Sequence, residues 1–307
     1  MAQSAASAPS SGRARIALSE ERLGLIMVLP ALFLMSVVAA YPVLRALWLS
    51  FHQYNIKVPA DTKFVGLDNY VRILSSPHWW TAVKTTFTFT AVSVSIEFVL
   101  GLALALVMNR ALGWLTGVVR VAVLVPWATI TVVTALAWKW IFTPDLTFGG
   151  FATMYGWIAK DACVLCGQFS ALMAMVFADV WKTAPFIALL LLAGLQSIDS
   201  EMYEAADVDG ASWTTQFVKI TLPCLKASIL VALLFRTLDA FRMFDLAYVM
   251  TGGANNTETV SMLAYDHLIK RLNMGLGSAM SVLIFLMVLV IALFFTRVLG
   301  AQPNEDR

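Results

Sequence analysis

Long apolar runs separated by shorter polar segments dominate the chain, and six of these runs are long enough to cross a lipid bilayer. A helix needs about 20 residues to span the hydrocarbon core. The six runs cover residues 23–49, 83–108, 119–142, 169–195, 225–250 and 275–299. Residues 99–108 and 281–295 are apolar without the alternation of a barrel strand. Because only helices and closed barrels satisfy the backbone inside lipid, the pattern predicts an all-α integral membrane bundle of six transmembrane helices.

The composition supports this prediction and removes other classes of protein. Of the 307 residues, 60% are apolar and 13% are charged, against about 45–50% and about 25% in an ordinary soluble domain. That much apolar surface argues against a soluble globule and against a disordered chain. Three cysteines are too few for a disulfide scaffold, and a net charge of +2 gives no reason to expect a nucleic-acid partner.

Both ends of the chain are more polar than the segment between them. Residues 1–22 are rich in Ala, Ser and Arg and are expected to form a disordered tail, and residues 300–307 are expected to form a second tail. The transmembrane domain is then 23–299. The apolar run after Arg22 is too long for a signal-peptide core and lacks a clear cleavage site, so we expect it to remain as a span.

An even number of spans puts both ends of the chain on one side of the membrane. With both ends inside, the inner segments hold nine Lys and Arg residues and the outer segments hold eight, so the positive-inside rule decides little. Arg13, Arg15 and Arg22 precede the first span, which usually dominates the orientation. We therefore expect both termini to be cytoplasmic.

The segment 199–223, between the fourth and fifth spans, carries the signals of a helix–turn–helix outside the membrane. Ser200 is a good N-cap, and Gly210 suits the residue that ends a helix. A second short helix is expected over 211–220, before Pro223. Composition alone favours a solvated connector for this segment.

The spacing of residues in this segment resembles the EAA loop of ABC importer permeases. Residues 204–206 read Glu-Ala-Ala, Gly210 follows after three more residues, and residues 220–223 read Ile-Thr-Leu-Pro. The resemblance implies that the first short helix is a coupling helix, which sits in a cleft of a cytoplasmic ATPase. The residues expected to form this ATPase-coupling site are Glu204, Ala205, Ala206, Asp207, Gly210, Leu222 and Pro223.

The sequence contains no nucleotide-binding loop of the form GxxxxGKS or GxxxxGKT. The resemblance therefore implies that this chain is a transport subunit and not an enzyme, and that it binds no cofactor itself. ATP and Mg would be held by two partner ATPase subunits in the cytoplasm. This chain would supply a path through the membrane and not the hydrolysis.

Other parts of the chain are similar to the carbohydrate-importing, maltose-type branch of the same family. This likeness implies a permease that forms half of the path for a disaccharide, with trehalose favoured. Another sugar, glycerol phosphate and an ion-coupled secondary transporter are the alternatives. The stretches that carry the likeness are 64–70, 137–142 and 251–258 and, toward the trehalose-importing permeases of mycobacteria, 91–110, 233–244 and 275–285.

The same resemblance implies a set of partners in the inner membrane of a bacterium. These are a second homologous permease subunit, the two ATPase subunits and an extracytoplasmic sugar-binding lipoprotein. The loops after the first and fifth spans would dock the sugar-binding protein. The docking residues expected in these loops are Asn69, Gly252, Gly253 and Asn256.

Ionisable residues inside the fourth and fifth spans mark interior or water-lined positions, because a charge at the bilayer centre costs about 2.5–3.5 kcal/mol. Two readings stay open: a structural network with cross-span pairs such as Asp179–Arg236 or Lys182–Asp239, and a polar sugar site. Glu97, alone in the second span, is expected to bind a neighbouring helix rather than substrate. In maltose-type relatives these two spans contact sugar, which implies the candidates Asp179, Lys182, Thr183, Phe186, Arg236 and Asp239.

Cys163 and Cys166 form a CxxC pair in a predicted outer loop. No second CxxC pair and no nearby His supports zinc, so no metal site is expected. A local disulfide and two free thiols are the readings that stay open.

Overall fold

The computed structural model describes residues 20–109, 115–143 and 163–298. The chain divides into two compact units, Met1–Trp48 and Leu49–Arg307. The first unit is helical, with α1 (Glu20–Met35), a π-helical segment (Ser36–Ala40) and α2 (Tyr41–Ser50), which runs across the boundary. The tails expected at 1–22 and 300–307 lie outside the described residues, except for 20–22, which begin α1.

The second unit is an all-α bundle with one short pair of strands. Strand β1 (His52–Gln53) pairs antiparallel with β2 (Lys63–Phe64), with His52 opposite Phe64. The helices are α3 (Asp68–Leu74), α4 (Pro77–Asn109), α5 (Leu115–Ala128), α6 (Thr131–Phe142), α8 (Gln168–Gln196), α9 (Ser200–Val208), α10 (Trp213–Gln216), α11 (Leu222–Phe241), α12 (Asp245–Met250), α13 (Val260–Tyr265) and α14 (Met274–Val298). Short 3-10 or π segments lie at Pro59–Asp61, Phe217–Thr221, Ala254–Asn256 and Asp266–Lys270.

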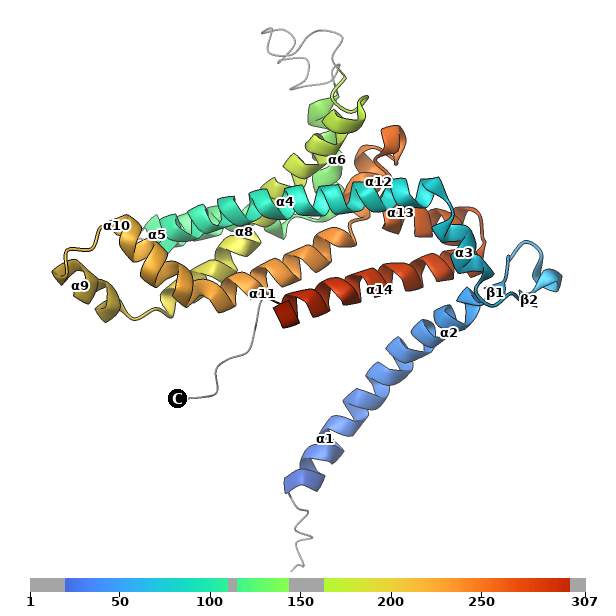
Figure 1. Cartoon of the computed structure of the whole chain (residues 1–307), viewed down its shortest axis with the longest axis horizontal. Coiled ribbons are helices and arrows are strands. Elements are labelled where there is room, and N and C mark those ends of the chain that lie inside the picture. Colours follow the sequence, from blue (N-terminus) through green and yellow to red (C-terminus); the bar gives the residue numbers. More distant parts are fainter. Residues whose placement is uncertain (1–19, 110–114, 144–162, 299–307) are drawn as a thin grey trace, which may run out of the picture. The chain divides into compact units, whose positions relative to one another are not determined.

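The long helices α4, α8, α11 and α14 run side by side, with α9 and α10 at one end and α3, α12 and α13 at the other (Figure 1). Helix α4 packs closely on α8, and a glycine permits the approach. A Cβ on Gly101 would lie 2.7 Å from Cγ2 of Ile187, well inside van der Waals contact. This close packing therefore joins two of the helices that carry charged residues of the membrane interior, Glu97 on α4 and Asp179 on α8.

The predicted membrane bundle is confirmed, with one change in the third span. Among the residues that the structure describes, five helices are long and apolar enough to cross a membrane: Gly24–Ser50, Pro77–Asn109, Gln168–Gln196, Trp213–Phe241 and Met274–Arg297. The sixth candidate, expected as one helix over 119–142, is a pair of helices, Gly117–Ala128 and Thr131–Phe142, bent by 88°. The chain leaves the helix after Pro126, whose carbonyl accepts from the Thr129 hydroxyl at 2.6 Å, and Ile130 is extended. Proline and threonine together redirect the backbone here.

The fifth span, expected to continue over 225–250, was also predicted too long. Helix α11 ends at Phe241, and α12 resumes only at Asp245, after a non-helical Phe244. The guanidinium of Arg242 donates back to the carbonyl of Leu238 at 3.2 Å and satisfies a group that the helix end leaves open. The break brings Asp245 to the start of a new helix instead of the end of a long one.

The segment before α11 differs from the expected short helix over 211–220. The helix begins at Trp213, capped by Ser212, and continues through the π segment Phe217–Thr221 into α11, so Pro223 lies inside one long helix. A wider π turn just before a proline accommodates its ring and its missing N–H. The N-cap of α9 is Asp199 and not Ser200, because the Asp199 carboxylate accepts from the backbone N–H of Glu201 at 3.0 Å.

Candidate substrate cavity and coupling site

Arg236 on α11 lies among carboxylates from three helices and is almost completely buried, with 3% of its side chain exposed. Its Nε donates to Oε2 of Glu97 on α4 at 2.5 Å, and its Nη2 donates to Oε1 of the same residue at 2.9 Å. Its Nη2 also donates to Asp179 on α8, and its Nη1 donates to Asp239, one turn further along α11, at 2.9 Å. The Asp179–Arg236 pair that the sequence suggested is therefore formed.

Glu97 is the most buried member of this cluster, with none of its side chain exposed. Besides Arg236, it accepts from the hydroxyl of Ser93 at 2.9 Å and from that of Thr183 at 2.5 Å. The expectation that Glu97 binds a neighbouring helix is confirmed, since Thr183 lies on α8 and Arg236 on α11. Buried charges are stable only when paired and hydrogen-bonded in this way.

A polar cavity of about 330 Å³ opens beside Arg236. Lys182 does not pair with Asp239; its ammonium donates to the hydroxyl of Thr131 on α6 at 2.6 Å. Phe186 is not among the lining residues, and its ring stacks on that of Trp127 with centroids 5.7 Å apart. The lining residues are Thr131, Asp179, Lys182, Thr183, Arg236, Asp239, Ala240, Arg242, Met243, Phe244, Asp245 and Leu246.

Three polar cavity residues were missed as site candidates by sequence reasoning: Thr131, Arg242 and Asp245. Thr131 begins α6 directly after the bend, separated by two residues from the end of α5. Arg242 and Asp245 lie in the predicted fifth span, and a regular helix over 225–250 would turn some of the charged side chains of that span away from the cavity. The break after Phe241 brings them to the cavity wall.

The predicted coupling segment stands at one end of the bundle (Figure 1). Glu204 and Ala205 are exposed, and Gly210 has the left-handed φ of +74° that the sequence predicted for a helix stop. Two contacts tie α9 to the long helix that follows. Asp207 accepts from the amide of Gln216 at 2.5 Å, and the hydroxyls of Tyr203 and Thr221 are 3.0 Å apart.

The predicted docking residues fall into two groups. Asn69 is buried, with 2% exposed, and its amide donates to the backbone carbonyls of Ser50 and His52 at 2.9 and 3.0 Å. Its side chain is therefore committed inside the chain. Gly252, Gly253 and Asn256, in contrast, form a left-handed turn with φ of 62°, 82° and 57°, and Asn256 is exposed.

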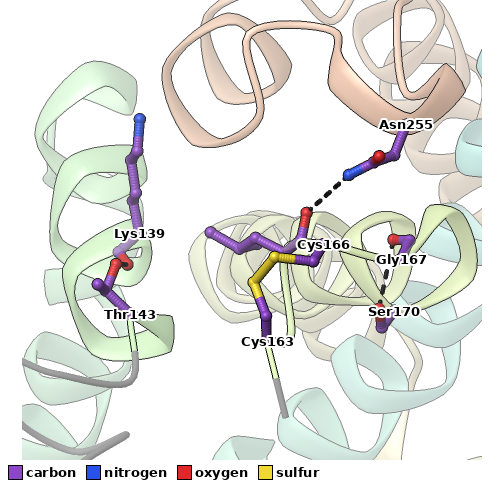
Figure 2. The surroundings of a disulfide bond; sticks show 8 residues. Lys139, Thr143, Cys163, Cys166, Gly167, Ser170 and Asn255 are labelled. Atoms are coloured by element: carbon purple, nitrogen blue, oxygen red, sulfur yellow. Dashed lines mark hydrogen bonds between the residues drawn. A yellow bond between two sulfur atoms is a disulfide. The ribbon is translucent and has the colours of Figure 1, made fainter. Parts of the chain in front are cut away.

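This turn is held from several sides. The amide of Asn255 donates to the carbonyl of Leu165 at 3.1 Å, inside the turn that the Cys163–Cys166 disulfide closes (Figure 2). The structure thus has the disulfide, one of the two states left open for the CxxC pair. The ammonium of Lys139 donates to the backbone carbonyl of Val249 at 2.9 Å, and the hydroxyl of Thr85 donates to the backbone carbonyl of Asn256 at 2.9 Å. His78 pairs with Glu258 at 2.7 Å. The loop is therefore preformed.

Comparison with known proteins decides the family. The family described as binding-protein-dependent transport system inner membrane component matches residues 97–302. The chain belongs to this family. It is 50% identical to the trehalose transport system permease protein SugA of Mycobacterium tuberculosis, over 92% of this chain and 91% of that protein. It is 41% identical to the trehalose/maltose transport system permease protein MalF of Thermococcus litoralis, over 91% and 94% of the two chains.

Solved structures agree on the fold. The crystal structure of a bacterial ABC transporter involved in the import of the acidic polysaccharide alginate has a chain that matches with a TM-score of 0.79 and 23% identity, over 90% of this chain and 94% of that chain. This chain is therefore a multi-pass permease subunit of an ABC importer of the maltose type in the inner membrane. It is a transport component and not an enzyme, and the family excludes the ion-coupled secondary transporter.

Proposed function

We propose that this chain forms half of the translocation path of an importer for an uncharged disaccharide, with trehalose as the first candidate. The observation that carries the substrate is the 50% identity to a trehalose permease over nearly the whole chain. The polar cavity supports it, because carboxylate, ammonium and hydroxyl groups all face one space of about 330 Å³. Sugar hydroxyls both donate and accept, so such a mixed wall can satisfy many of them.

Within the cavity we assign the sugar contacts to Asp179, Lys182, Thr183 and Asp239. Asp239 keeps 72% of its side chain exposed, so its carboxylate can accept from a sugar hydroxyl while it also accepts from Arg236. Lys182 has three N–H donors and uses one on Thr131. Arg236 itself orients these groups more than it contacts sugar, since it is nearly buried.

The partners we propose follow from this role. A second homologous permease completes the path, two cytoplasmic ATPase subunits hold ATP and Mg, and an extracytoplasmic sugar-binding lipoprotein docks on the loop around Gly252, Gly253 and Asn256. Both termini are cytoplasmic, on the same side as α9. A related structure, a bacterial alginate ABC transporter in complex with its alginate pentasaccharide-bound periplasmic protein, supports a partner of this last kind.

Coupling runs through α9. When the ATPase subunits close on ATP, the helix carrying Glu204 moves with one of them, and its bonds to Gln216 and Thr221 pull on the helix that carries Arg236 and Asp239. The cavity then opens outward to receive sugar from the binding protein. Hydrolysis resets the bundle inward.

The substrate is tested with the complete transporter reconstituted in vesicles with its sugar-binding protein. A panel of trehalose, maltose, lactose and glycerol 3-phosphate is presented, and ATP hydrolysis and uptake are measured. We expect trehalose to stimulate both most strongly. Stimulation by glycerol 3-phosphate alone would reject the disaccharide assignment.

The coupling role is tested with Glu204→Lys and Gly210→Pro. The first change reverses the charge offered to the ATPase, and the second removes the left-handed residue that the turn requires. Both variants should insert into the membrane and lose sugar uptake. The control Lys84→Gln removes an exposed charge on α4, outside the coupling segment and the docking loops, and should transport normally. Wild-type uptake by both coupling variants would contradict the role of α9.

A further inference from the structure

The charges around the cavity are unevenly matched. Four carboxylates (Glu97, Asp179, Asp239 and Asp245) face three cations (Lys182, Arg236 and Arg242), and Glu97 lies behind Arg236, away from the cavity lining. The excess of one negative charge should disfavour an anionic ligand, because like charges brought together cost binding free energy. If the path carries sugar, as proposed above, this charge balance affects which sugars the path accepts.

Arg236 would be the natural partner for a phosphate or carboxylate on a sugar, because a guanidinium binds such groups through two parallel N–H bonds. Its donors are already committed. Nε, both N–H groups of Nη2 and one of Nη1 are directed at protein carboxylates, which accounts for four of its five N–H donors. An anion that enters the cavity therefore meets a guanidinium whose charge is already balanced by protein carboxylates.

Glu97 contributes most to this arrangement. It receives two of the four Arg236 bonds in the two-pronged geometry, and it is itself fixed by hydroxyls from α4 and α8. With none of its side chain exposed, it cannot touch a ligand in the cavity. Its effect on ligand choice must therefore pass through the cavity-lining residues that it bonds, Arg236 and Thr183, and of these two Arg236 carries the charge.

We propose that Glu97 is a specificity-determining positioning residue: it neutralises Arg236 from behind, so that the cavity accepts uncharged sugars and rejects anionic ones. Without its charge, the cavity and its surround balance at three carboxylates and three cations. The positive charge of Arg236 would then no longer be offset from behind, and it would favour the phosphate of a ligand in the cavity. The same geometry explains how an arginine can border a path for uncharged sugar.

The test uses the purified complete transporter, with its partner permease and ATPase subunits but without the sugar-binding protein, so that only the membrane path selects. Binding of trehalose and of trehalose 6-phosphate is measured by equilibrium dialysis with labelled sugars. Wild type should prefer trehalose. Glu97→Gln, which keeps the size and removes the charge, should shift the ratio of the two affinities toward the phosphate by roughly tenfold.

Three further variants separate charge from general loosening of the bundle. Glu97→Asp keeps the carboxylate and should keep the wild-type preference. Glu97→Gln combined with Arg236→Gln removes both charges of the buried pair and should still reject the phosphate, because no guanidinium is unmasked. Asp61→Asn, which changes a carboxylate in an exposed loop, should leave the ratio unchanged.

The outcomes distinguish this proposal from the proposed function. Equal binding of both sugars by wild type, or a gain of phosphate binding in the double variant, overturns the role of Glu97 even when trehalose uptake is normal. If Glu97→Gln does not assemble, Glu97→Ala, which also removes the charge behind Arg236, takes its place, and an unchanged ratio of the two affinities in that variant overturns the role of Glu97. Wild-type complex that neither binds nor transports trehalose, while transporting another sugar, rejects trehalose as substrate.

Discussion

At the scale of single residues, Arg236 holds the membrane interior together. It joins Glu97 on α4 and Asp179 on α8 to its own helix, and each of these carboxylates lies where water is scarce. Removing one partner of a buried ion pair is more costly than the pair is stabilising, because the remaining charge has no solvent to return to. The sequence identified these residues by their charge but could not choose between a structural and a substrate role, since both use the same groups.

We predict that Arg236→Met destabilises the protein strongly, by roughly 3–5 kcal/mol, because it leaves Glu97 and Asp179 buried without a cation. The thermal midpoint of the detergent-solubilised transporter measures the effect. Arg242→Met is the control, since Arg242 is exposed and its bond is to its own helix. A midpoint that falls equally in both variants would argue against the buried network.

The loop that we assign to docking gives a second residue-scale prediction. Asn255 has a left-handed φ of 57°, and its amide binds the carbonyl of Leu165. Asn255→Ala loses that bond and strains the backbone, whereas Asn255→Gly loses the bond and tolerates the φ. We expect both to weaken association with the sugar-binding protein, and Ala more than Gly, as measured by surface plasmon resonance. Unchanged association in both variants would remove this loop from the docking surface.

At the scale of elements, the apolar pattern predicted where the membrane helices lie but not where they break. The break at Thr129 and Ile130 and the break after Phe241 lie inside runs that average as apolar, so hydropathy alone does not reveal them. The EAA spacing predicted Gly210 correctly, because a left-handed turn demands a specific residue type. The contact of Tyr203 with Thr221, in the π segment before Pro223, joins residues 18 positions apart, and no local pattern reveals it.

The packing of α4 on α8 predicts a sharp response to side-chain size at Gly101. A Cβ there would lie 2.7 Å from Ile187 Cγ2 and 3.2 Å from the carbonyl of Ala184, so Gly101→Val must push the helices apart. We expect a lower thermal midpoint and loss of uptake. Gly117→Val is the control on α5, because a Cβ at Gly117 has nothing within 4 Å. Equal effects of the two variants would mean that helix propensity and not packing is responsible.

At the scale of the whole molecule, the proposed roles of the two ends of the bundle depend on its orientation in the membrane. Glu204 can meet a cytoplasmic motor and Asn256 an outer partner only if they lie on opposite sides of the membrane. Of the three cysteines, Cys163 and Cys166 are joined, which leaves the exposed Cys224, one residue after Pro223, as a reporter of the side of the membrane on which α11 begins.

We predict that Cys224 reacts with a membrane-impermeant maleimide only after cells are permeabilised. The control is Lys57→Cys in a Cys224→Ser background, since Lys57 is exposed in the loop that follows α2 and should react in intact cells. Labelling efficiency is read by gel shift. Reaction of Cys224 in intact cells would invert the topology and place α9 out of reach of an ATPase.

The unbroken run from Trp213 to Phe241 has a thermodynamic consequence. At 1.5 Å per residue, roughly 35 Å of this helix separates Trp213, which follows the coupling segment, from Arg236. A contact at α9 that favours one tilt of this helix also changes the position of Arg236 at the cavity. ATP binding to the proposed ATPase subunits and sugar binding in the cavity are therefore thermodynamically linked. The factor by which ATP changes the affinity for sugar must then equal the factor by which sugar changes the affinity for ATP.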